Sequence, residues 1–235
     1  MQKNIKLRHS VINFVREFMN SEGFMELATP ILTAPSPEGA RDYLVPSRIH
    51  KGSFYALPQA PQQFKQLYIA SGIDKYFQIA PCFRDEDSRA DRSPGEFYQI
   101  DMEMSFATQE DVLDIISRLL FEVFDKFKGK QKSVNNLPFP TFTFKESMEQ
   151  FGCDKPDLRN PLRLKNVTKF FKGSGLQIFE KLIEKGAIVN CIEASKSQGK
   201  PRSFYDNLNK WAIDQGKKGL GYINFCLLYT SPSPR

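Results

Sequence analysis

The sequence has few cysteines and histidines and no long apolar run, and each of these absences argues against a class of protein. The four cysteines lie far apart with no CxxC pair, at Cys82, Cys153, Cys191 and Cys226, and only two histidines accompany them. This composition argues against a zinc site and against a disulfide scaffold. No run of about 18 apolar residues occurs, and the N-terminus lacks the apolar core and cleavage site of a secretory signal. The expected compartment is the reducing cytoplasm.

The remaining composition is that of a folded, mildly basic protein. Apolar residues make up 40% of the 235 positions, enough for the core of one large domain, or of one domain and part of another. The formal net charge is +6. A charge of this size is compatible with a polyanionic partner such as nucleic acid, although many proteins carry it without one.

The N-terminal third of the chain alternates between predicted helices and strands. Apolar residues at helical spacing in "IKLRHSVINFVREFMNSEGF" predict a helix that ends near Gly23. The segment "FMELATPIL" predicts a strand that Pro30 interrupts near its end, and "TAPSPEGARDYLVP" predicts a loop. After it, "GSFYALPQ" predicts a strand and "APQQFKQLYIASG" predicts a helix with a proline near its first turn.

A hairpin with an unusually long polar connection is predicted next. The strands are "KYFQIAPCFR" and "FYQIDMEMSF", and the loop between them carries acids and arginines. Long connections inside compact domains are usually functional. The following segment, "TQEDVLDIISRLLFEVFDKFKG", predicts an amphipathic helix with Thr108 as its N-cap.

The character of the chain changes after Lys130. The segment "FPTFTFKESMEQFG" predicts a short strand and a helix, and "CDKPDLRNP" predicts a loop. From about Pro161, Lys-rich segments that alternate between helix and strand predict a small α+β module ending near Phe225. The last ten residues, 226–235, are rich in serine and proline and are expected to be a non-native tail, with a natural flexible terminus as the alternative.

The residue types around the charged loop fit adenylate chemistry. An arginine at a strand end, Arg84, could bind the α-phosphate of ATP through two hydrogen bonds. Glu86 could accept from an adenine amino group or help to hold Mg²⁺, and Phe97 could stack on the base. Asp101 could bind an ammonium group. A mixed charge run is nevertheless most often a solvated loop with weak ion pairs, so spacing alone leaves both interpretations open.

Several long motifs resemble one family. The residues "FRDED-RADR-P-EFYQID-EMSF" resemble motif 2 of the class II aminoacyl-tRNA synthetases in the aspartyl-tRNA synthetase form. The segment "GFMELATPILTAPSPEGARDYLVPSR" looks like the motif 1 strand and mobile loop of that family, and "FYALPQAPQQFKQLYIASG" looks like its amino-acid-binding segment. "GCDKPDLRNP" matches the bacterial type. The likeness is nearly continuous over residues 6–225, with the motifs in the family's order.

This resemblance implies an aspartate site. Its residues would be Glu38, Gln62, Gln63, Phe64, Lys65, Arg84 and Asp101. Glu38 would lie in a loop that closes over aspartate and is ordered by Arg41 and Asp42. Lys65 would pair with the side-chain carboxylate of the substrate, because a buried cation selects an anionic substrate, and Asp101 would take its ammonium group. Gln99 would face the same pocket, since alternate strand positions share a face.

The resemblance also implies the other contacts of the reaction. ATP would be bound by Arg84, Asp85, Glu86, Ser93 and Phe97. Arg84 would be the catalytic residue, on the α-phosphate and the reacting carboxylate. Arg89 and Arg92 would meet the phosphate backbone of tRNA(Asp). Pro30 would lie at the interface of a homodimer.

The chain departs from the family pattern at three positions. Ala60 stands where a serine is common, so one polar contact to the amino acid is in doubt. "RSPGEF" has one residue more than the commoner "RQPEF", which puts the ATP contact of Ser93 in doubt and adds Gly95. The variant leaves open whether tRNA(Asn) is charged as well as tRNA(Asp).

The expected fold is a mixed α/β (α+β) domain, an antiparallel sheet flanked by helices, over residues 1–160. The start of a small α+β insertion domain would follow over residues 161–225. An OB-fold anticodon domain, motif 3 and the main ligands of Mg²⁺ are absent from the sequence, so the chain is expected to be a fragment unable to complete catalysis. Alternatives are an asparaginyl-type synthetase, an inactive tRNA-binding paralogue and an ATP-dependent ligase of the asparagine synthetase A type.

Overall fold

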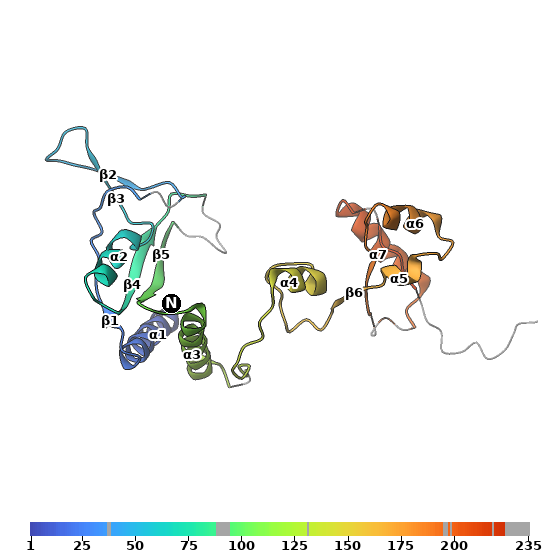
Figure 1. The fold of residues 1–235 in the computed structure, drawn as a ribbon, viewed down its shortest axis with the longest axis horizontal. Helices are drawn as coiled ribbons and strands as arrows, with labels where there is room; N and C mark the ends of the chain where they lie inside the picture. Colours follow the sequence, from blue (N-terminus) through green and yellow to red (C-terminus); the bar gives the residue numbers. More distant parts are fainter. Residues whose placement is uncertain are drawn as a thin grey trace, which may run out of the picture. The chain divides into compact units, whose positions relative to one another are not determined.

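The computed structural model describes residues 1–36, 39–87, 95–130, 132–194, 197, 199–217 and 219–223 (Figure 1). The chain forms two compact units, Met1–Phe139 and Pro140–Arg235. The predicted domain limits at residues 160 and 225 stay a prediction. Among the described residues, no helix combines the length and the apolar character that crossing a bilayer requires.

The first unit is a three-stranded sheet with helices and a small second sheet. Its elements in chain order are α1 (Gln2–Ser21), β1 (Met25–Glu26), β2 (Leu44–Pro46), β3 (Phe54–Ala56), α2 (Gln62–Ala70), β4 (Lys75–Phe83), β5 (Glu96–Met104) and α3 (Gln109–Phe127). The main sheet has the order β1-β4-β5, with β1 parallel and β5 antiparallel to β4. The predicted β4–β5 hairpin is therefore confirmed, and β2 and β3 form a separate antiparallel pair.

The core lies between one face of the main sheet and the helices α1 and α3 (Figure 1). Its buried members are Val15, Phe18, Met19, Phe24, Phe77, Ile115 and Leu119. The helical residues among them recur at spacings of three and four, which places them on one side of each helix. Ile79, Met102 and Met104 of the sheet pack against this cluster. Because strand side chains alternate in direction, the positions between them face the other side of the sheet.

Helix α3 begins as its sequence predicts. The Thr108 side chain accepts from the Asp111 amide, and the Asp111 carboxylate accepts from the Thr108 amide, which is a capping box. The helix is tied to the end of α1 by Arg118, whose guanidinium donates to both carboxylate oxygens of Glu22 at 2.5 and 2.8 Å. This bidentate pair holds the two helices in register on the sheet.

Two predicted strands are shorter than expected. "FMELATPIL" forms a strand only at β1, after which the Leu27 amide makes one further bond to the Phe77 carbonyl. The Thr29 hydroxyl instead donates to Gln78, and Pro30 has no amide hydrogen to continue a ladder. "GSFYALPQ" is likewise reduced to β3, because after the bond from the Leu57 amide to the Tyr43 carbonyl, Pro58 has no amide hydrogen to continue the ladder.

The second unit is a two-stranded sheet with short helices. Its elements are α4 (Phe144–Phe151), β6 (Leu164–Asn166), α5 (Thr168–Phe171), α6 (Gln177–Glu184), β7 (Asn190–Ile192) and α7 (Arg202–Asp214), and β6 pairs antiparallel with β7. The strand predicted before α4 is wrong: Pro138 and Pro140 lack the amide hydrogens that a ladder needs. In "GLGYINF", the described residues 219–223 form no helix or strand, and the predicted tail at 226–235 lies outside the described residues.

Two adjacent leucines of α3 test the position of the core. Leu119 is buried and Leu120 is exposed. We expect Leu119→Ala to lower the free energy of unfolding by about 2–5 kcal/mol, because it removes apolar contacts and leaves a cavity. Leu120→Ala makes the same chemical change on the outer side of the helix and should cost less than about 1 kcal/mol. Urea denaturation of both variants measures the difference. Equal losses of unfolding free energy would mean that α3 does not pack on the core through the side that carries Leu119.

Candidate functional site

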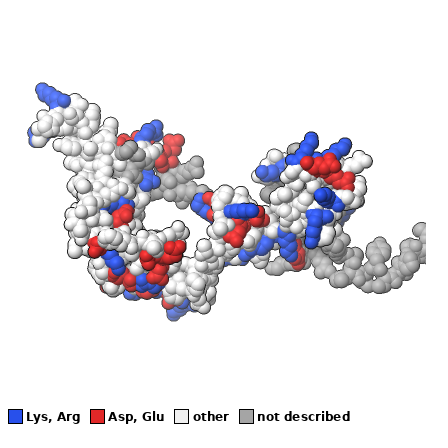
Figure 2. All heavy atoms as spheres, viewed as in Figure 1, with Lys and Arg blue, Asp and Glu red and all other residues white. Residues whose placement is uncertain are grey.

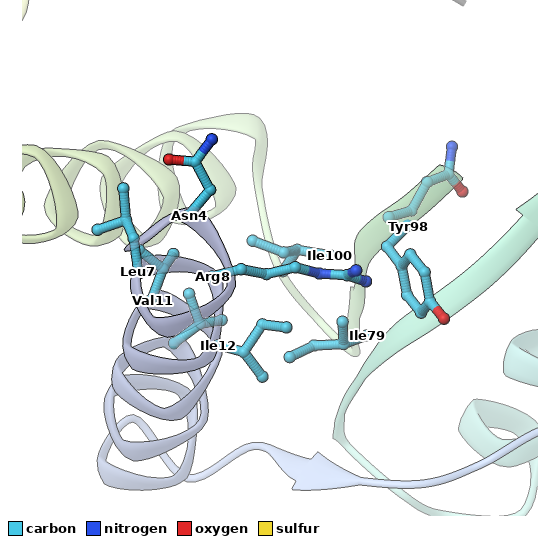
Figure 3. A pocket seen from close by; sticks show the side chains of 10 residues that line it. Asn4, Leu7, Arg8, Val11, Ile12, Ile79, Tyr98 and Ile100 are labelled. Atoms are coloured by element: carbon cyan, nitrogen blue, oxygen red, sulfur yellow. The ribbon is translucent and has the colours of Figure 1, made fainter. Parts of the chain in front are cut away.

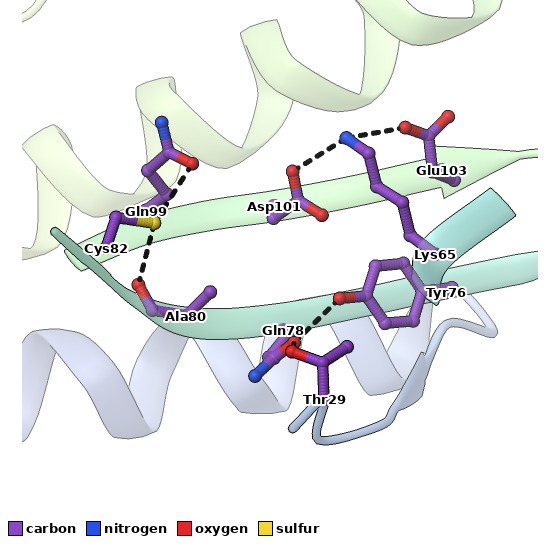
Figure 4. A network of polar contacts seen from close by, with 9 residues as sticks. All are labelled: Thr29, Lys65, Tyr76, Gln78, Ala80, Cys82, Gln99, Asp101 and Glu103. Carbon is purple, nitrogen blue, oxygen red and sulfur yellow. Dashed lines mark hydrogen bonds and ion pairs between the residues drawn. The ribbon is translucent and has the colours of Figure 1, made fainter. Parts of the chain in front are cut away.

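The polar site lies on the face of the β4–β5 hairpin that points away from the core. Four residue pairs share this face in the observed register: Tyr76 with Glu103, Gln78 with Asp101, Ala80 with Gln99, and Cys82 with Phe97. The alternation of strand side chains explains why one hairpin builds both the core and a polar surface. Helix α2 supplies Lys65 above this surface (Figure 4).

Lys65 is a buried cation held by two carboxylates. Its Nζ lies 2.9 Å from an oxygen of Asp101 and 2.7 Å from an oxygen of Glu103. The side chains of Lys65 and Asp101 are only 10% and 11% exposed, whereas Glu103 is 35% exposed. The group therefore has one cation for two acids. An ammonium has three hydrogens to donate, so these two contacts leave one donor for a ligand.

Burial and pairing act in opposite directions on these groups. Burial alone would lower the pKa of Lys65, but the hydrogen bonds to Glu103 and Asp101 outweigh it and hold that pKa above the ordinary value. Lys65 is thus a permanent cation near neutral pH. For Asp101, burial is the larger effect and raises the pKa of the carboxyl, although the neighbouring Lys65 works against the rise. Burial, followed by the charge of Asp101, also raises the pKa of Tyr76.

One oxygen of Asp101, Oδ2, is buried without a hydrogen bond of normal geometry, although the Tyr76 hydroxyl lies near enough to work against the rise in the pKa of the carboxyl. Among the described residues, its Oδ2 is the buried side-chain oxygen or nitrogen that has no hydrogen bond. Neighbouring groups are already engaged: the Tyr76 hydroxyl donates to Gln78 Oε1 at 2.8 Å, and the Thr29 hydroxyl donates to the same oxygen at 3.1 Å (Figure 4). A buried, unpaired carboxylate oxygen is costly unless a ligand donates to it. Oδ2 is therefore suited to an ammonium group.

Arg84 and Phe97 lie together at one end of the site. The Arg84 guanidinium carbon is 5.0 Å from the centre of the Phe97 ring, in a cation–π contact. The Arg84 amide donates to the Gly95 carbonyl at 2.8 Å, which closes the base of the charged loop. Of the three acids directly after Arg84, Asp85 is partly buried, and Glu86 and Asp87 are exposed. The two groups predicted to meet the phosphate and the base of ATP are thus neighbours.

Gln59 anchors the loop that precedes β2. It is fully buried, and its amide nitrogen donates to the Ala40 carbonyl at 3.0 Å and to Asp42 at 2.5 Å, while its oxygen accepts from the Ala40 amide. Arg41 and Asp85 join the same loop to the end of β4. The Asp85 amide donates to the Arg41 carbonyl, and the Arg41 guanidinium donates to the Asp85 carbonyl. The ordering role predicted for Arg41 and Asp42 stays a prediction.

The additional glycine has a steric reason in this structure. A Cβ atom at Gly95 would lie 2.6 Å from the Tyr43 hydroxyl oxygen and 3.4 Å from the Arg84 carbonyl. Only glycine admits the Tyr43 hydroxyl at this distance, because carbon atoms do not approach oxygen so closely. Gly95 thereby brings the end of the charged loop against the loop anchored by Gln59.

The remaining predicted residues fall into two groups. Gln63 and Phe64 line a small hollow with Pro30 and Ala60, whose lining does not include Lys65, and Gln62 is partly buried. Glu38, Ser93, Arg89 and Arg92 lie outside the described residues. Their roles stay predictions. In the described part of the chain, no group of three or more His, Cys, Asp or Glu side chains could hold a metal ion.

Sequence analysis missed four members of the site: Gln59, Tyr76, Gln78 and Glu103. Glu103 had a usable signal, because it stands two positions after Asp101 and so shares its face. Gln78 is a polar residue in the middle of an otherwise apolar strand, which also marks a buried partner. Nothing local distinguishes Gln59, since its partners lie 17 and 19 residues earlier.

A larger hollow, of about 380 Å³, lies on the opposite face of the sheet (Figure 3). It is lined by apolar residues of α1 and by Ile79, Tyr98 and Ile100, and Arg8 lies across it with its guanidinium carbon 4.6 Å from the centre of the Tyr98 ring. The lining of this hollow contains one cation, Arg8, and no carboxylate. The face of the sheet that carries Lys65 and Asp101 presents both a cation and a carboxylate, so it suits the two opposite charges of an amino acid better.

Comparison with known proteins gives consistent matches. The family model described as tRNA synthetases class II (D, K and N) matches residues 1–215. An aspartate--tRNA(Asp/Asn) ligase of Paramagnetospirillum magneticum is 60% identical over 94% of this chain and 25% of that relative. The ligase of the same name from Rickettsia bellii is 56% identical over 96% of this chain and 37% of that relative. The chain thus spans between a quarter and just over a third of these relatives.

Among solved structures, an aspartyl-tRNA synthetase candidate from Leishmania major Friedlin aligns with a TM-score of 0.45. It is 27% identical, and the alignment covers 52% of this chain and 22% of that one.

Removing the buried cation should produce a pH-dependent loss of stability. We expect Lys65→Met to lower the free energy of unfolding by about 3 kcal/mol at pH 8, because two carboxylates lose their cation. Without Lys65, the pKa of Asp101 in the folded state rises further above its unfolded value of about 3.9. The folded variant then binds more protons than the unfolded chain, so its stability falls as the pH rises through that pKa. The loss should therefore be smaller at pH 5.

Urea denaturation at pH 5 and pH 8 measures this effect. The double variant Lys65→Met/Asp101→Asn is the control, because it removes the titrating carboxyl and should lose most of the pH dependence. An equal loss for Lys65→Met at both pH values would contradict the assignment.

The close approach of Tyr43 to Gly95 predicts a rescue. We expect Gly95→Ala to cost about 1–2 kcal/mol of stability, because the new methyl group must displace the Tyr43 hydroxyl. Tyr43→Phe removes that oxygen, and the next ring atom lies at an ordinary 3.6 Å. The double variant Gly95→Ala/Tyr43→Phe should regain most of the loss in thermal denaturation. A double variant no more stable than Gly95→Ala would sink this explanation.

Proposed function

Because the chain belongs to the class II tRNA synthetases of the D, K and N type, we propose that it carries the amino-acid and ATP site of an aspartate--tRNA ligase. The protein of which it forms part would make aspartyl-adenylate from L-aspartate and ATP and transfer aspartate to tRNA(Asp). The names of the similar relatives extend the proposal to tRNA(Asn).

The observation that carries the choice of aspartate is the buried ion pair. Lys65 keeps one donor for the side-chain carboxylate of the substrate, and Asp101 keeps one buried oxygen for the substrate ammonium. Lysine, a substrate of another branch of the family, would bring a second cation against Lys65, which like-charge repulsion opposes. Asparagine would bring a neutral amide, which interacts more weakly than a carboxylate with the charge of the Lys65 ammonium. The remaining donor of Lys65 thus suits a side-chain carboxylate, and the excess negative charge of the two acids suits the substrate ammonium.

Activation needs positioning and charge stabilisation rather than a covalent enzyme intermediate. An oxygen of the aspartate α-carboxylate attacks the α-phosphorus of ATP, and pyrophosphate leaves. Arg84 would neutralise the charge that develops on the α-phosphate, and Phe97 would stack on adenine after the guanidinium has moved to the phosphate. The terminal adenosine hydroxyl of tRNA then attacks the aspartyl carbonyl, and AMP leaves.

Other parts of the proposal concern residues outside the described part of the chain, or rest on membership of the family alone. Contacts of Glu38 with aspartate, of Ser93 with ATP, and of Arg89 and Arg92 with tRNA belong to it, as does a homodimer formed around Pro30. Mg²⁺ would accompany ATP, with its main ligands in a C-terminal part of the protein that this chain does not include; the described residues gather no group of three or more metal-binding side chains. No step is therefore assigned to the ion. A cytoplasmic location completes the proposal.

Isothermal titration with amino acids tests the function. L-aspartate should bind the chain at least about tenfold more tightly than L-asparagine, since a buried charge pair discriminates strongly between isosteric ligands. Lys65→Met should abolish this preference, because the cation that faces the carboxylate is gone. Lys145→Gln removes an equally charged but 82% exposed side chain and should change nothing. Tighter binding of asparagine would favour an asparaginyl enzyme, and no binding of either would favour a paralogue without activation.

A further inference from the structure

The β2–β3 hairpin is a rigid arm with an ordered tip. We call residues 47–53, between the two strands, the basic tip. The Ser47 amide donates to the Ser53 carbonyl at 2.9 Å, the Ser53 amide to the His50 carbonyl at 3.1 Å, and the His50 amide to the Ser47 hydroxyl at 3.0 Å. Gly52 adopts a positive φ of 80°, which allows the chain to reverse. In Figure 1 the tip extends outward beyond the β2–β3 pair.

The charge of the arm is of one sign. Between Asp42 and Asp74 the sequence contains no aspartate or glutamate. Arg48, His50 and Lys51 are all exposed at the basic tip, and within the described residues neither Arg48 nor Lys51 forms an ion pair. In Figure 2, Lys and Arg atoms mark the outer end of the arm, and no acidic atoms accompany them in that view. Unpaired cations at the end of a projecting element form a site for an external polyanion.

We propose that the basic tip binds the phosphate backbone of RNA, and specifically the tRNA of the proposed function, on which this inference rests. Arg48 and Lys51 would each contact a phosphate, and the 74% exposed Ile49 between them would pack on sugar or base. The strand ladder and the hydrogen bonds of the tip order the backbone that carries the cations before binding, which lowers the entropy cost of the contact.

The foot of the arm connects this surface to the candidate site. The Leu57 amide donates to the Tyr43 carbonyl, which closes the arm, and the Phe83 amide donates to the Pro58 carbonyl immediately before Arg84. The extended chain from Ser53, at the end of the tip, to Leu57 spans four residues, which corresponds to about 13 Å at 3.3 Å per residue. The tip would therefore hold a part of the RNA distant from the terminal nucleotide that reacts beside Arg84.

A second copy of the chain is the rival occupant. Leu44 and Phe54 on the flanks of the arm are 56% and 53% exposed, and apolar side chains of this kind can pack in a dimer. The tip itself, however, carries only positive charge, and two copies of one basic surface repel each other. The charge therefore favours a polyanion over a self-contact.

The test compares two charge-matched double variants of the full chain. Arg48→Gln/Lys51→Gln removes both tip cations, and Lys3→Gln/Lys6→Gln removes two exposed cations of α1 in the same unit. Binding of an in vitro transcript of tRNA(Asp) is followed by fluorescence anisotropy over a range of salt concentrations. The tip variant should bind about tenfold more weakly and lose about two units from the slope of log affinity against log salt, since each phosphate contact contributes about one. The α1 variant should stay within about twofold of the wild type.

Titration with L-aspartate separates the two proposals. An unchanged aspartate affinity in the tip variant shows that the site is intact. If aspartate binding is intact, three results would overturn the RNA-binding role of the tip while the proposed function stands. They are wild-type tRNA affinity in the tip variant, an equal loss of affinity in the α1 variant, and no tRNA binding by the wild type. A wild type that binds tRNA but not aspartate overturns the proposed function, and the tip is still decided by the two variants. If sedimentation shows that only the tip variant loses self-association, the arm is a contact between copies and the inference is wrong.

Discussion

The structure of the first unit depends on one buried cation and the groups that make its burial tolerable. A lysine ammonium with a side chain only 10% exposed needs nearby negative charge, and Asp101 and Glu103 provide it from alternate positions of β5. That requirement fixes how α2 lies over the hairpin, because Nζ must reach both oxygens. It also leaves the group with an excess negative charge and an unfilled hydrogen bond on Asp101. The unfilled hydrogen bond and the excess negative charge that remain when Lys65 is buried are thus the features that would select an amino acid.

The β4–β5 hairpin serves the core and the site at once, and the alternation of its side chains makes this possible. Phe77 and Met102 face the helices, while their neighbours Gln78 and Asp101 face α2. A shift of the register by one residue would bury the acids and expose the core, so the packing of α1 and α3 also sets the geometry of the polar face. The ion pair between Arg118 and Glu22 lies on the far side of the sheet from Lys65, yet it supports the site by holding the helices that fix this register.

The sequence contains most of this arrangement in its periodicities. The hairpin, the helices that flank it and the N-cap at Thr108 follow from spacing and residue type, because the features that specify them are local. The lengths of β1 and β3 do not follow, since they depend on whether a distant strand offers partners and on side chains such as Thr29 that compete for them. The site divides in the same way. Lys65 is predicted by the motif resemblance, and Asp101 already by its residue type and its place on the strand, but Gln59 acts through contacts that only the folded chain creates.

Three segments far apart in the sequence meet at the edge of the site, and their contacts are mostly made by the backbone. Arg41 pairs with Asp85, Tyr43 with Leu57, and Arg84 with Gly95, each through an amide and a carbonyl. Such contacts constrain the path of the chain but place few demands on side chains, except where two segments approach most closely. That point is Gly95, where the Tyr43 hydroxyl takes the space of a side chain. Glycine at this position lets the ring of Tyr43 lie against the backbone, whereas a side chain would have to displace the hydroxyl. Gly95 thus links Arg84, through its backbone, to the loop held by Gln59.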